Sequence, residues 1–266
     1  MQIRSLRAPL ALALGFLAAR AAVAHDTWLL PERFVLTKPK TIVCEMTSGM
    51  RFPRLESAIE RSRVERAELR FRGTLSTIEE RRSETHALAF LLPLRGPGVA
   101  TVAVALKPRT LELTPAQVGE YLTEIGAPEA VRAAWAASPG KVWRETYRKL
   151  AKTVVRVGDG EDSSWSEPVG LPFELVPEGD PTRLAKGQTL AVRLLRDGKP
   201  RAGLAVGVLR AGEAAGVLLT SDADGRVTAS FPRRGRYLLR STELLPEGAG
   251  GDAWTSDFTT LTVDVR

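Results

Sequence analysis

The sequence predicts a mainly β protein made of two antiparallel β-sandwich domains, the first with a small helical insert. Three observations indicate this fold class. Short apolar and β-branched runs bounded by Pro, Gly and polar clusters fill most of residues 25–109, as is typical of strands. The apolar residues adopt the spacing of helices at about 114–150, and residues 181–266 return to apolar–polar alternation.

Residues 1–24 have the pattern of a secretory signal peptide. Arg4 and Arg7 supply the positive start, residues 8–19 the apolar core, and Ala-Val-Ala stands directly before His25 as a small-x-small cleavage sequence. The apolar core is shorter than the roughly 20 residues of a transmembrane helix. We therefore expect a periplasmic protein whose mature chain begins at His25 and contains no transmembrane segment.

The first domain, expected over residues 25–165, contains several strand-like runs. These runs are FVLT, TIVCEM, AELRFR, HALAFLLPL and VATVAVAL. Each is short, rich in apolar residues and separated from the next by turn-forming residues, which favours a β-sandwich.

The helical insert has recognisable start and stop signals. Thr114 is suited to cap a helix, Pro115 to its first turn, and Gly126 to its end. Pro128 begins a second short helix. The segment 138–158 has a pattern that predicts a third helix passing into the strand TVVRV.

A second sandwich follows a proline-rich linker, expected at residues 166–180. The strand-like runs in 181–266 are TLAVRLL, AGLAVGVLR, GVLLTSDADGRVTASF, GRYLLRS and WTSDFTTLTVDV. Their spacing of about ten residues is typical of a small antiparallel sandwich. Asp224-Gly225 predicts a tight hairpin, because Gly accepts the positive φ of a two-residue turn.

Charge and cysteine content exclude some classes of protein. The formal charge of +7 falls to about +4 once the three arginines of residues 1–24 are removed. Basic residues are interspersed with acidic ones and not with aromatic ones, so we expect no nucleic acid as a partner. Cys44 is the sole cysteine, so the fold has no internal disulfide.

The strongest candidate for chemistry is the mature amino terminus. Once His25 is freed, its α-amino nitrogen and imidazole Nδ1 can chelate one metal ion, and such nitrogen donors suit Cu or Ni. Asp26 adds a neighbouring carboxylate. The alternative is a frayed terminus that carries no ligand.

Sulfur donors form a second candidate. Met46 and Met50 lie within six residues of Cys44, and soft sulfur ligands select Cu(I). Strand alternation points Ile42, Cys44 and Met46 to one face, so packing in the core is the alternative.

His86 is a third candidate. Alternation with Leu88 and Phe90 places it toward the core, as a packing residue. If it lies close to His25, three nitrogen donors would surround one ion.

Enzyme motifs are lacking in the sequence. Neither a G-x-S-x-G elbow nor an H-E-x-x-H helix is present, and we expect no enzymatic activity. A hydrolase with paired carboxylates remains as a weaker alternative. Another is a metal-free envelope module that recognises glycan, peptide or a protein partner. It would use exposed Trp28, Trp143, Trp165 or Trp254 as a platform.

Several motifs resemble those of an exported family, domain of unknown function 4198. They are AHDTWLLP, SGMRFP, YLTEIG, WRETYRKLAKTVVRVG, GLPFELVPEGDPTRLAKGQTLAVRLLRDGKPRAG and SDADGRVTASFPRRGRYLLR, and they span nearly all of the mature chain. The second half is similar to prealbumin-like and collagen-adhesin-B-like sandwiches. Members resemble periplasmic accessory components of nickel or cobalt uptake systems, which implies that His25 is a metal ligand.

One departure concerns a histidine that members often carry after the GRYLLR strand. Here Ser241-Thr242-Glu243 occupies that place, and Glu243 is a candidate substitute ligand. We expect a non-enzymatic protein that binds nickel or cobalt, with copper as an alternative. Its partner would be a membrane metal-uptake transporter. The expected ligands are His25, Asp26, His86, Cys44, Met46 and Met50.

Overall fold

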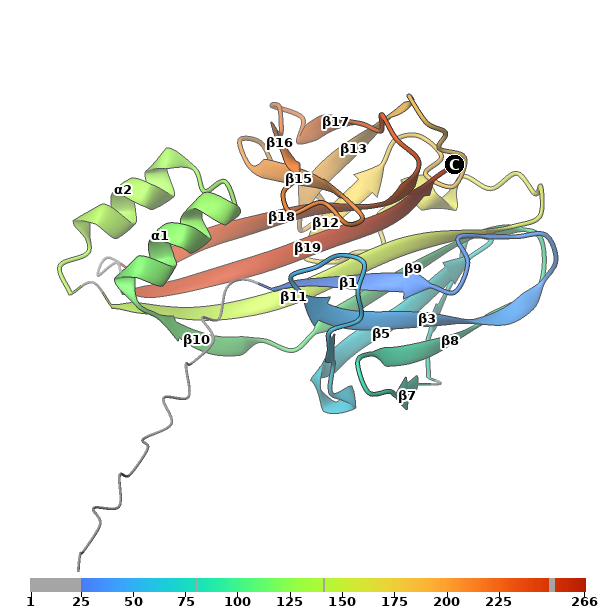
Figure 1. The fold of residues 1–266 in the computed structure, drawn as a ribbon, viewed down its shortest axis with the longest axis horizontal. Helices are drawn as coiled ribbons and strands as arrows, with labels where there is room; N and C mark the ends of the chain where they lie inside the picture. The colour runs from blue at the N-terminus through green and yellow to red at the C-terminus, as the bar shows by residue number, and fades with distance from the viewer. Residues whose placement is uncertain (1–24, 80, 141, 249–251) are drawn as a thin grey trace, which may run out of the picture.

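The computed structural model describes residues 25–79, 81–140, 142–248 and 252–266, which form three layered β-sheets and two helices (Figure 1). The expected signal peptide lies outside the described residues. Neither of the two helices in the described chain has the length and apolar character needed to span a membrane.

The first sheet has the strand order β1-β3-β8-β7, with β4 beside β3. Its strands are β1 (Asp26–Pro31), β3 (Lys40–Gly49), β4 (Ser57–Ala58), β7 (Arg81–Ser83) and β8 (Leu88–Leu94). The third sheet has the order β12-β13-β14, with β17 beside β13. Its strands are β12 (Phe173–Pro177), β13 (Thr189–Arg196), β14 (Lys199–Pro200) and β17 (Arg226–Ser230).

The middle sheet is the largest, with the order β16-β15-β18-β19-β11-β9-β5-β6, and β2 and β10 also pair with β11. Its strands are β2 (Val35–Leu36), β5 (Val64–Phe71), β6 (Thr74–Thr77), β9 (Gly98–Leu106), β10 (Arg109–Leu113), β11 (Trp143–Val157), β15 (Ala205–Arg210), β16 (Val217–Thr220), β18 (Gly235–Glu247) and β19 (Ala253–Val265). The helices are α1 (Pro115–Glu124) and α2 (Glu129–Ala137).

Strand β9 shows how the layers are stacked. Every residue of this strand is buried, because the two faces of the middle sheet are both covered. Val102 and Val104 pack with the first sheet. Ala103 and Ala105 point the other way and pack with the third sheet. A continuous apolar run is the sequence signature of a strand buried on both faces.

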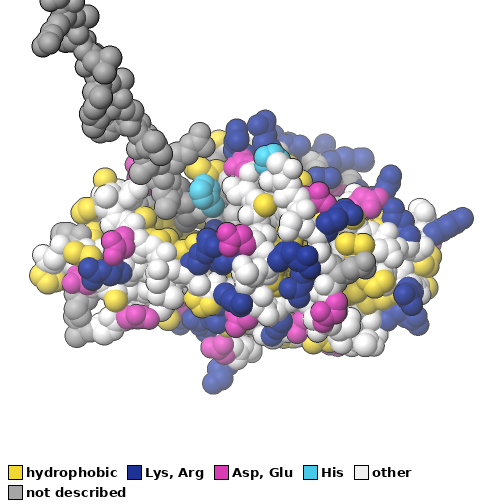
Figure 2. Space-filling view, turned by 90° about the horizontal axis from the view of Figure 1, so that it is seen from below, with side chains coloured by type: hydrophobic (Ala, Val, Ile, Leu, Met, Phe, Trp, Pro, Cys, Tyr) yellow, Lys and Arg dark blue, Asp and Glu magenta, His cyan; other side chains and the backbone are white. Residues whose placement is uncertain are grey.

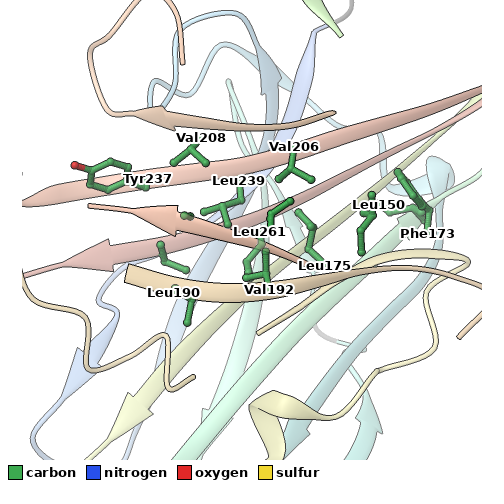
Figure 3. Packing of buried hydrophobic residues seen from close by; sticks show 14 of the residues in the cluster. Leu150, Phe173, Leu175, Leu190, Val192, Val206, Val208, Tyr237, Leu239 and Leu261 are labelled. Carbon is green, nitrogen blue, oxygen red and sulfur yellow. The ribbon is translucent and has the colours of Figure 1, made fainter. Parts of the chain in front are cut away.

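The core between the middle and third sheets is built from alternating apolar residues. Leu239 on β18 and Leu261 on β19 face Leu175 and Val192 of the third sheet (Figure 3). All four side chains are fully buried. This packing of one sheet on another supplies the apolar burial that stabilises the carboxy-terminal half.

Strands β11 and β19 join the two halves of the chain. They pair in parallel, from Arg144 opposite Ala253 to Thr153 opposite Thr262. The prediction of a mainly β fold is therefore confirmed, with packed sheets as in a sandwich, whereas the middle sheet is mixed and not purely antiparallel. The domain limits 25–165 and 181–266 remain predictions. The middle sheet contains strands from both ranges, so these limits do not separate the sheets from one another.

The prediction of a third helix at the end of the insert (about 114–150) was wrong. Residues from Trp143 to Val157 form β11, which pairs with β10 and β19, and further along with β2 and β9. Thr146, Thr153 and the neighbouring aromatic and valine residues favour a strand. Hydrogen bonding to strands on both edges of β11 outweighs the helix-like spacing of its charged residues.

The other two helices agree with the predicted signals. Thr114 caps α1 and forms a capping box with Gln117, and Gly126 follows with φ of 60°. Trp135 of α2 packs edge-on against Trp143 at a centroid distance of 5.4 Å. The helices thereby cover the end of β11, as Figure 1 shows on its left side.

Two details of the second half differ from expectation. The predicted linker 166–180 contains β12, whose five residues are all buried. Gly225 does adopt a positive φ of 71°, but the hairpin prediction was wrong. This turn connects β16 of the middle sheet to β17 of the third sheet, and the two strands pair with β15 and β13 instead.

Replacing Lys152 by Met should lower the free energy of unfolding by about 3–5 kcal/mol, because a buried carboxylate would lose its counter-charge. Lys152 on β11 binds Glu174 on β12 at 2.6 Å, and both side chains are 1% exposed. Urea unfolding measures the effect. The control Lys40→Met breaks the half-exposed pair with Glu32 and should cost far less, because solvent screens exposed ion pairs. Equal losses in the two variants would contradict the assigned role of the buried pair.

Candidate functional site

His25 lies at the start of β1, on the surface, with its backbone held in place. The ammonium of Lys149 on β11 donates a hydrogen bond to the carbonyl oxygen of His25. Two residues later, the hydroxyl of Thr260 on β19 donates to the carbonyl of Thr27 at 2.7 Å. The start of β1 is therefore anchored to both strands that join the halves of the protein, unlike a frayed terminus.

Burial and the neighbouring charges favour the neutral form of the His25 imidazole. Partial burial and the nearby positive charge of Lys149 lower the pKa of His25, against the opposing effects of the Glu56 and Asp26 carboxylates. Burial also lowers the pKa of Lys149 to about 8, although Asp26 opposes the shift. A neutral imidazole has a free lone pair, which is the form that binds metal ions.

Asp26 is committed to other contacts. Its carboxylate pairs with Arg240 on β18, and the same Arg240 nitrogen lies 3.2 Å from Glu124 at the end of α1. Asp26, Glu124 and Arg240 line a surface pocket with Gly207 and Leu218, whereas His25 lines a separate one. These two predicted ligands therefore line different pockets and do not face one site.

The predicted position of His86 in the core was wrong. Strand β8 begins at Leu88, so His86 lies in the preceding turn, where the alternation on which the prediction rested does not apply. Its side chain is exposed, and its Nδ1 lies 3.3 Å from the carbonyl oxygen of Glu56. Figure 2 shows the two histidines of the chain, in cyan, on one face of the molecule.

Glu56 links the surroundings of the two histidines. Its carboxylate accepts hydrogen bonds from Arg51 Nε at 2.7 Å and from the Met50 amide at 3.1 Å, and its negative charge acts on His25. Its backbone carbonyl contacts His86. If His86 donates from Nδ1 to this carbonyl, its Nε2 is left as a free donor to a metal ion.

The three sulfur residues separate into two groups. Cys44 and Met46 are fully buried in the core between the first and middle sheets, and burial raises the pKa of the Cys44 thiol well above its ordinary value. Both therefore act as packing residues in the core, which was the alternative interpretation of these residues in the sequence. Met50 is 59% exposed and lines the pocket that contains Asp26.

Most of the residues that the alternative functions would use are buried. Trp28, Trp143 and Trp254 are 0% exposed, so they cannot form a surface platform, whereas Trp165 is half-buried. Glu243, the candidate substitute for the histidine of the family, is buried and paired with Arg201 and Arg196. The carboxylates of Asp26 and Glu124 do lie together, but Arg240 holds both as ion pairs.

Within the described ranges, no group of three or more His, Cys, Asp or Glu side chains is arranged to hold a metal ion. Sequence reasoning missed Glu56 and Lys149, which surround His25. Glu56 had no periodic signal, and Lys149 lay in the segment mistaken for a helix. A metal ion at His25 would depend on the terminal amine as a donor, in addition to side chains.

In the metal-free protein, Lys149→Met should raise the pKa of His25, because removal of a positive charge favours the imidazolium. Glu56→Gln should lower it further, because an attractive negative charge is lost. NMR titration of the His25 imidazole protons measures both shifts relative to the unsubstituted protein. Shifts in the same direction in the two variants would contradict this electrostatic description.

Comparisons with known proteins give one informative match. No protein of curated function matches the sequence. Among solved structures, trypsin-activated α-2-macroglobulin from Escherichia coli is 11% identical with a TM-score of 0.23, and the match covers 91% of this chain and 16% of that chain. The adhesin InvE from Yersinia pseudotuberculosis is 13% identical with a TM-score of 0.22, over 89% of this chain and 58% of that one.

The chain therefore spans less than two thirds of either protein, and TM-scores this low support no argument about fold or function. The family model is different, because it matches residues 22–242, which include His25, both helices and most of the middle sheet. On that match, the chain belongs to the family described as domain of unknown function (DUF4198).

Proposed function

We propose that this protein is a non-enzymatic periplasmic accessory protein that binds a transition-metal ion at its mature amino terminus. The observation that carries the proposal is the fixed position of His25. An exposed, neutral imidazole stands at the start of an anchored strand, directly after a small-x-small sequence. Cleavage there would add an α-amino nitrogen beside the imidazole, and the two would chelate one ion.

The surroundings of His25 offer further donors. The negative charge of the Glu56 carboxylate acts on His25, and the backbone carbonyl of Glu56 contacts the His86 imidazole. That carboxylate also pairs with Arg51 at the surface, so it would have to exchange this partner for the ion. Asp26, Cys44 and Met46 are left out of the ligand set, because they are engaged in an ion pair or in the core. A site with two strong protein donors leaves coordination positions open, which suits capture and delivery better than permanent storage.

The donor set favours particular ions. Amine and imidazole nitrogens with a carboxylate suit Ni²⁺, Co²⁺ or Cu²⁺, whereas Cu(I) would need several sulfur ligands, and Cys44 and Met46 are buried here while Met50 alone is exposed. Nickel or cobalt uptake by a membrane transporter, the role implied by the family resemblance, would place the protein in the periplasm as a donor of the ion.

The mature protein should bind one Ni²⁺ per chain, with an affinity that rises with pH as the amine loses its proton. Isothermal titration calorimetry between pH 6 and 8 measures this affinity for Ni²⁺, Co²⁺ and Cu²⁺. The matched control is the same protein with one N-acetylated alanine ahead of His25, which removes the amine from the chelate while the imidazole remains.

Affinity in the alanine-extended protein should fall by about tenfold or more, because the loss of one ligand costs more than 1.4 kcal/mol. Equal affinity in the two proteins would overturn the chelate. Absence of binding by both would favour the rival proposal, a metal-free module that recognises an envelope partner.

A further inference from the structure

The pocket that His25 lines is positively charged. Lys149, Arg63 and Arg109 contribute to its wall, and Glu60 is the acidic residue among its described lining residues. The cavity measures about 200 Å³, less than the roughly 300–1,000 Å³ of pockets that bind drug-sized ligands. Its size suits a small ion or metabolite.

The carboxylate of Glu60 neutralises the rim more than the interior. It lies 3.2 Å from Arg109, and the two side chains are 69% and 48% exposed. Lys149 is buried more deeply, and burial is the main reason why its pKa falls. Burial, and secondly repulsion by Arg109, lower the pKa of the Arg63 guanidinium, against the opposing effects of Tyr147 and Glu60. With three cationic side chains and one carboxylate, the lining of the pocket carries an excess of positive charge.

Hydrogen-bond donors in the pocket lack acceptors. The Nε atom of Arg63 is buried without a hydrogen-bond partner in the described structure, while its Nη2 donates to the carbonyl of Lys107 at 2.9 Å. The ammonium of Lys149 carries three protons, and its acceptor among the described residues is the carbonyl of His25. A buried donor without an acceptor is unfavourable, so an acceptor from a ligand would be stabilising.

Hydroxyl groups also line the pocket. Ser48 and Ser57 lie across from each other on β3 and β4, and both line the cavity with Tyr147. Hydroxyl groups accept or donate as a ligand requires. Guanidinium and ammonium groups with adjacent hydroxyls are the usual means by which proteins bind carboxylate and phosphate groups.

We propose that this pocket binds a small, multiply charged oxyanion of the carboxylate or phosphate type, held by Arg63, Arg109 and Lys149. The anion would place oxygen atoms near the orphaned Nε of Arg63 and the ammonium of Lys149. Its negative charge would also offset the repulsion that Lys149 exerts on a cation at His25. This last consequence rests on the proposed function, whereas anion binding itself does not require a metal.

Calorimetric titration of the metal-free mature protein with citrate and, separately, with inorganic phosphate tests the proposal. One site per chain is expected for at least one of them, with an affinity that falls as salt increases. Tighter binding of citrate would assign the carboxylate class, and tighter binding of phosphate the phosphate class. No binding of either anion would overturn the proposal.

Arg63→Gln should weaken anion binding by about tenfold or more, since a charge-assisted hydrogen bond contributes about 1.5–3 kcal/mol. The matched control is Arg233→Gln, which removes the same charge from a side chain that pairs with Glu213 outside this pocket and should leave affinity unchanged. Arg109→Gln provides a second variant if the first unfolds on heating. If Arg233→Gln weakened anion binding as much as Arg63→Gln, the loss would be explained by net charge alone, and the assignment of Arg63 to the anion site would be overturned.

The alanine-extended protein separates this proposal from the metal site. It should lose Ni²⁺ affinity and keep anion binding, because the extension changes the amine and leaves the arginines in place. Retained anion binding with no Ni²⁺ binding in any form of the protein would support the pocket and reject the metal proposal. Loss of anion binding in Arg63→Gln with unchanged Ni²⁺ binding would support both.

Discussion

The parallel pairing of β11 with β19 is the interaction on which the rest of the structure depends. It connects the strands of the amino-terminal half to those of the carboxy-terminal half within one sheet. β11 also carries the buried cation Lys152, which reaches Glu174 in the third sheet, and Arg156, which binds Asp180 and Thr182. Apolar packing on both faces and ionic contacts along one strand thus fix the layers relative to one another.

The same strand determines the candidate site. Lys149 lies on β11 opposite Phe258 of β19 and holds the carbonyl of His25. The site therefore exists because a lysine on the central strand reaches the start of β1. This arrangement has an electrostatic consequence, since the cation that positions His25 also repels any metal ion bound there. A nearby anion, or the loss of the Lys149 proton above a pH of about 8, relieves that repulsion.

Much of the fold could be predicted from the sequence because local signals and tertiary structure agree there. Alternation predicted the buried face of Ile42, Cys44 and Met46, and capping signals predicted α1 and α2. The prediction for β11 failed because its amino-terminal part is rich in Arg, Lys and Glu, and because two of its pairing partners, β2 and β19, lie more than 100 residues away in sequence. Long-range pairing overrides local pattern.

The candidate site could be predicted only in part. His25 was identified from the cleavage pattern alone, which marks a free amine but says nothing about its neighbours. Asp26 was assigned by adjacency, although strand geometry directs it toward Arg240. Glu56, Lys149 and Arg63 come from three separate elements or loops, and their convergence results from sheet packing that no local spacing encodes.

Hydrogen exchange of the mature protein, followed by mass spectrometry, tests the pairing of β11 with β19 most directly. Residues 144–153 and 253–262 should be among the most protected amides and should lose protection together as denaturant is added, as one cooperative unit. If residues 253–262 exchanged in a separate step while 144–153 stayed protected, the halves would be independent domains. The account of a site held in place by the central strand would then be wrong.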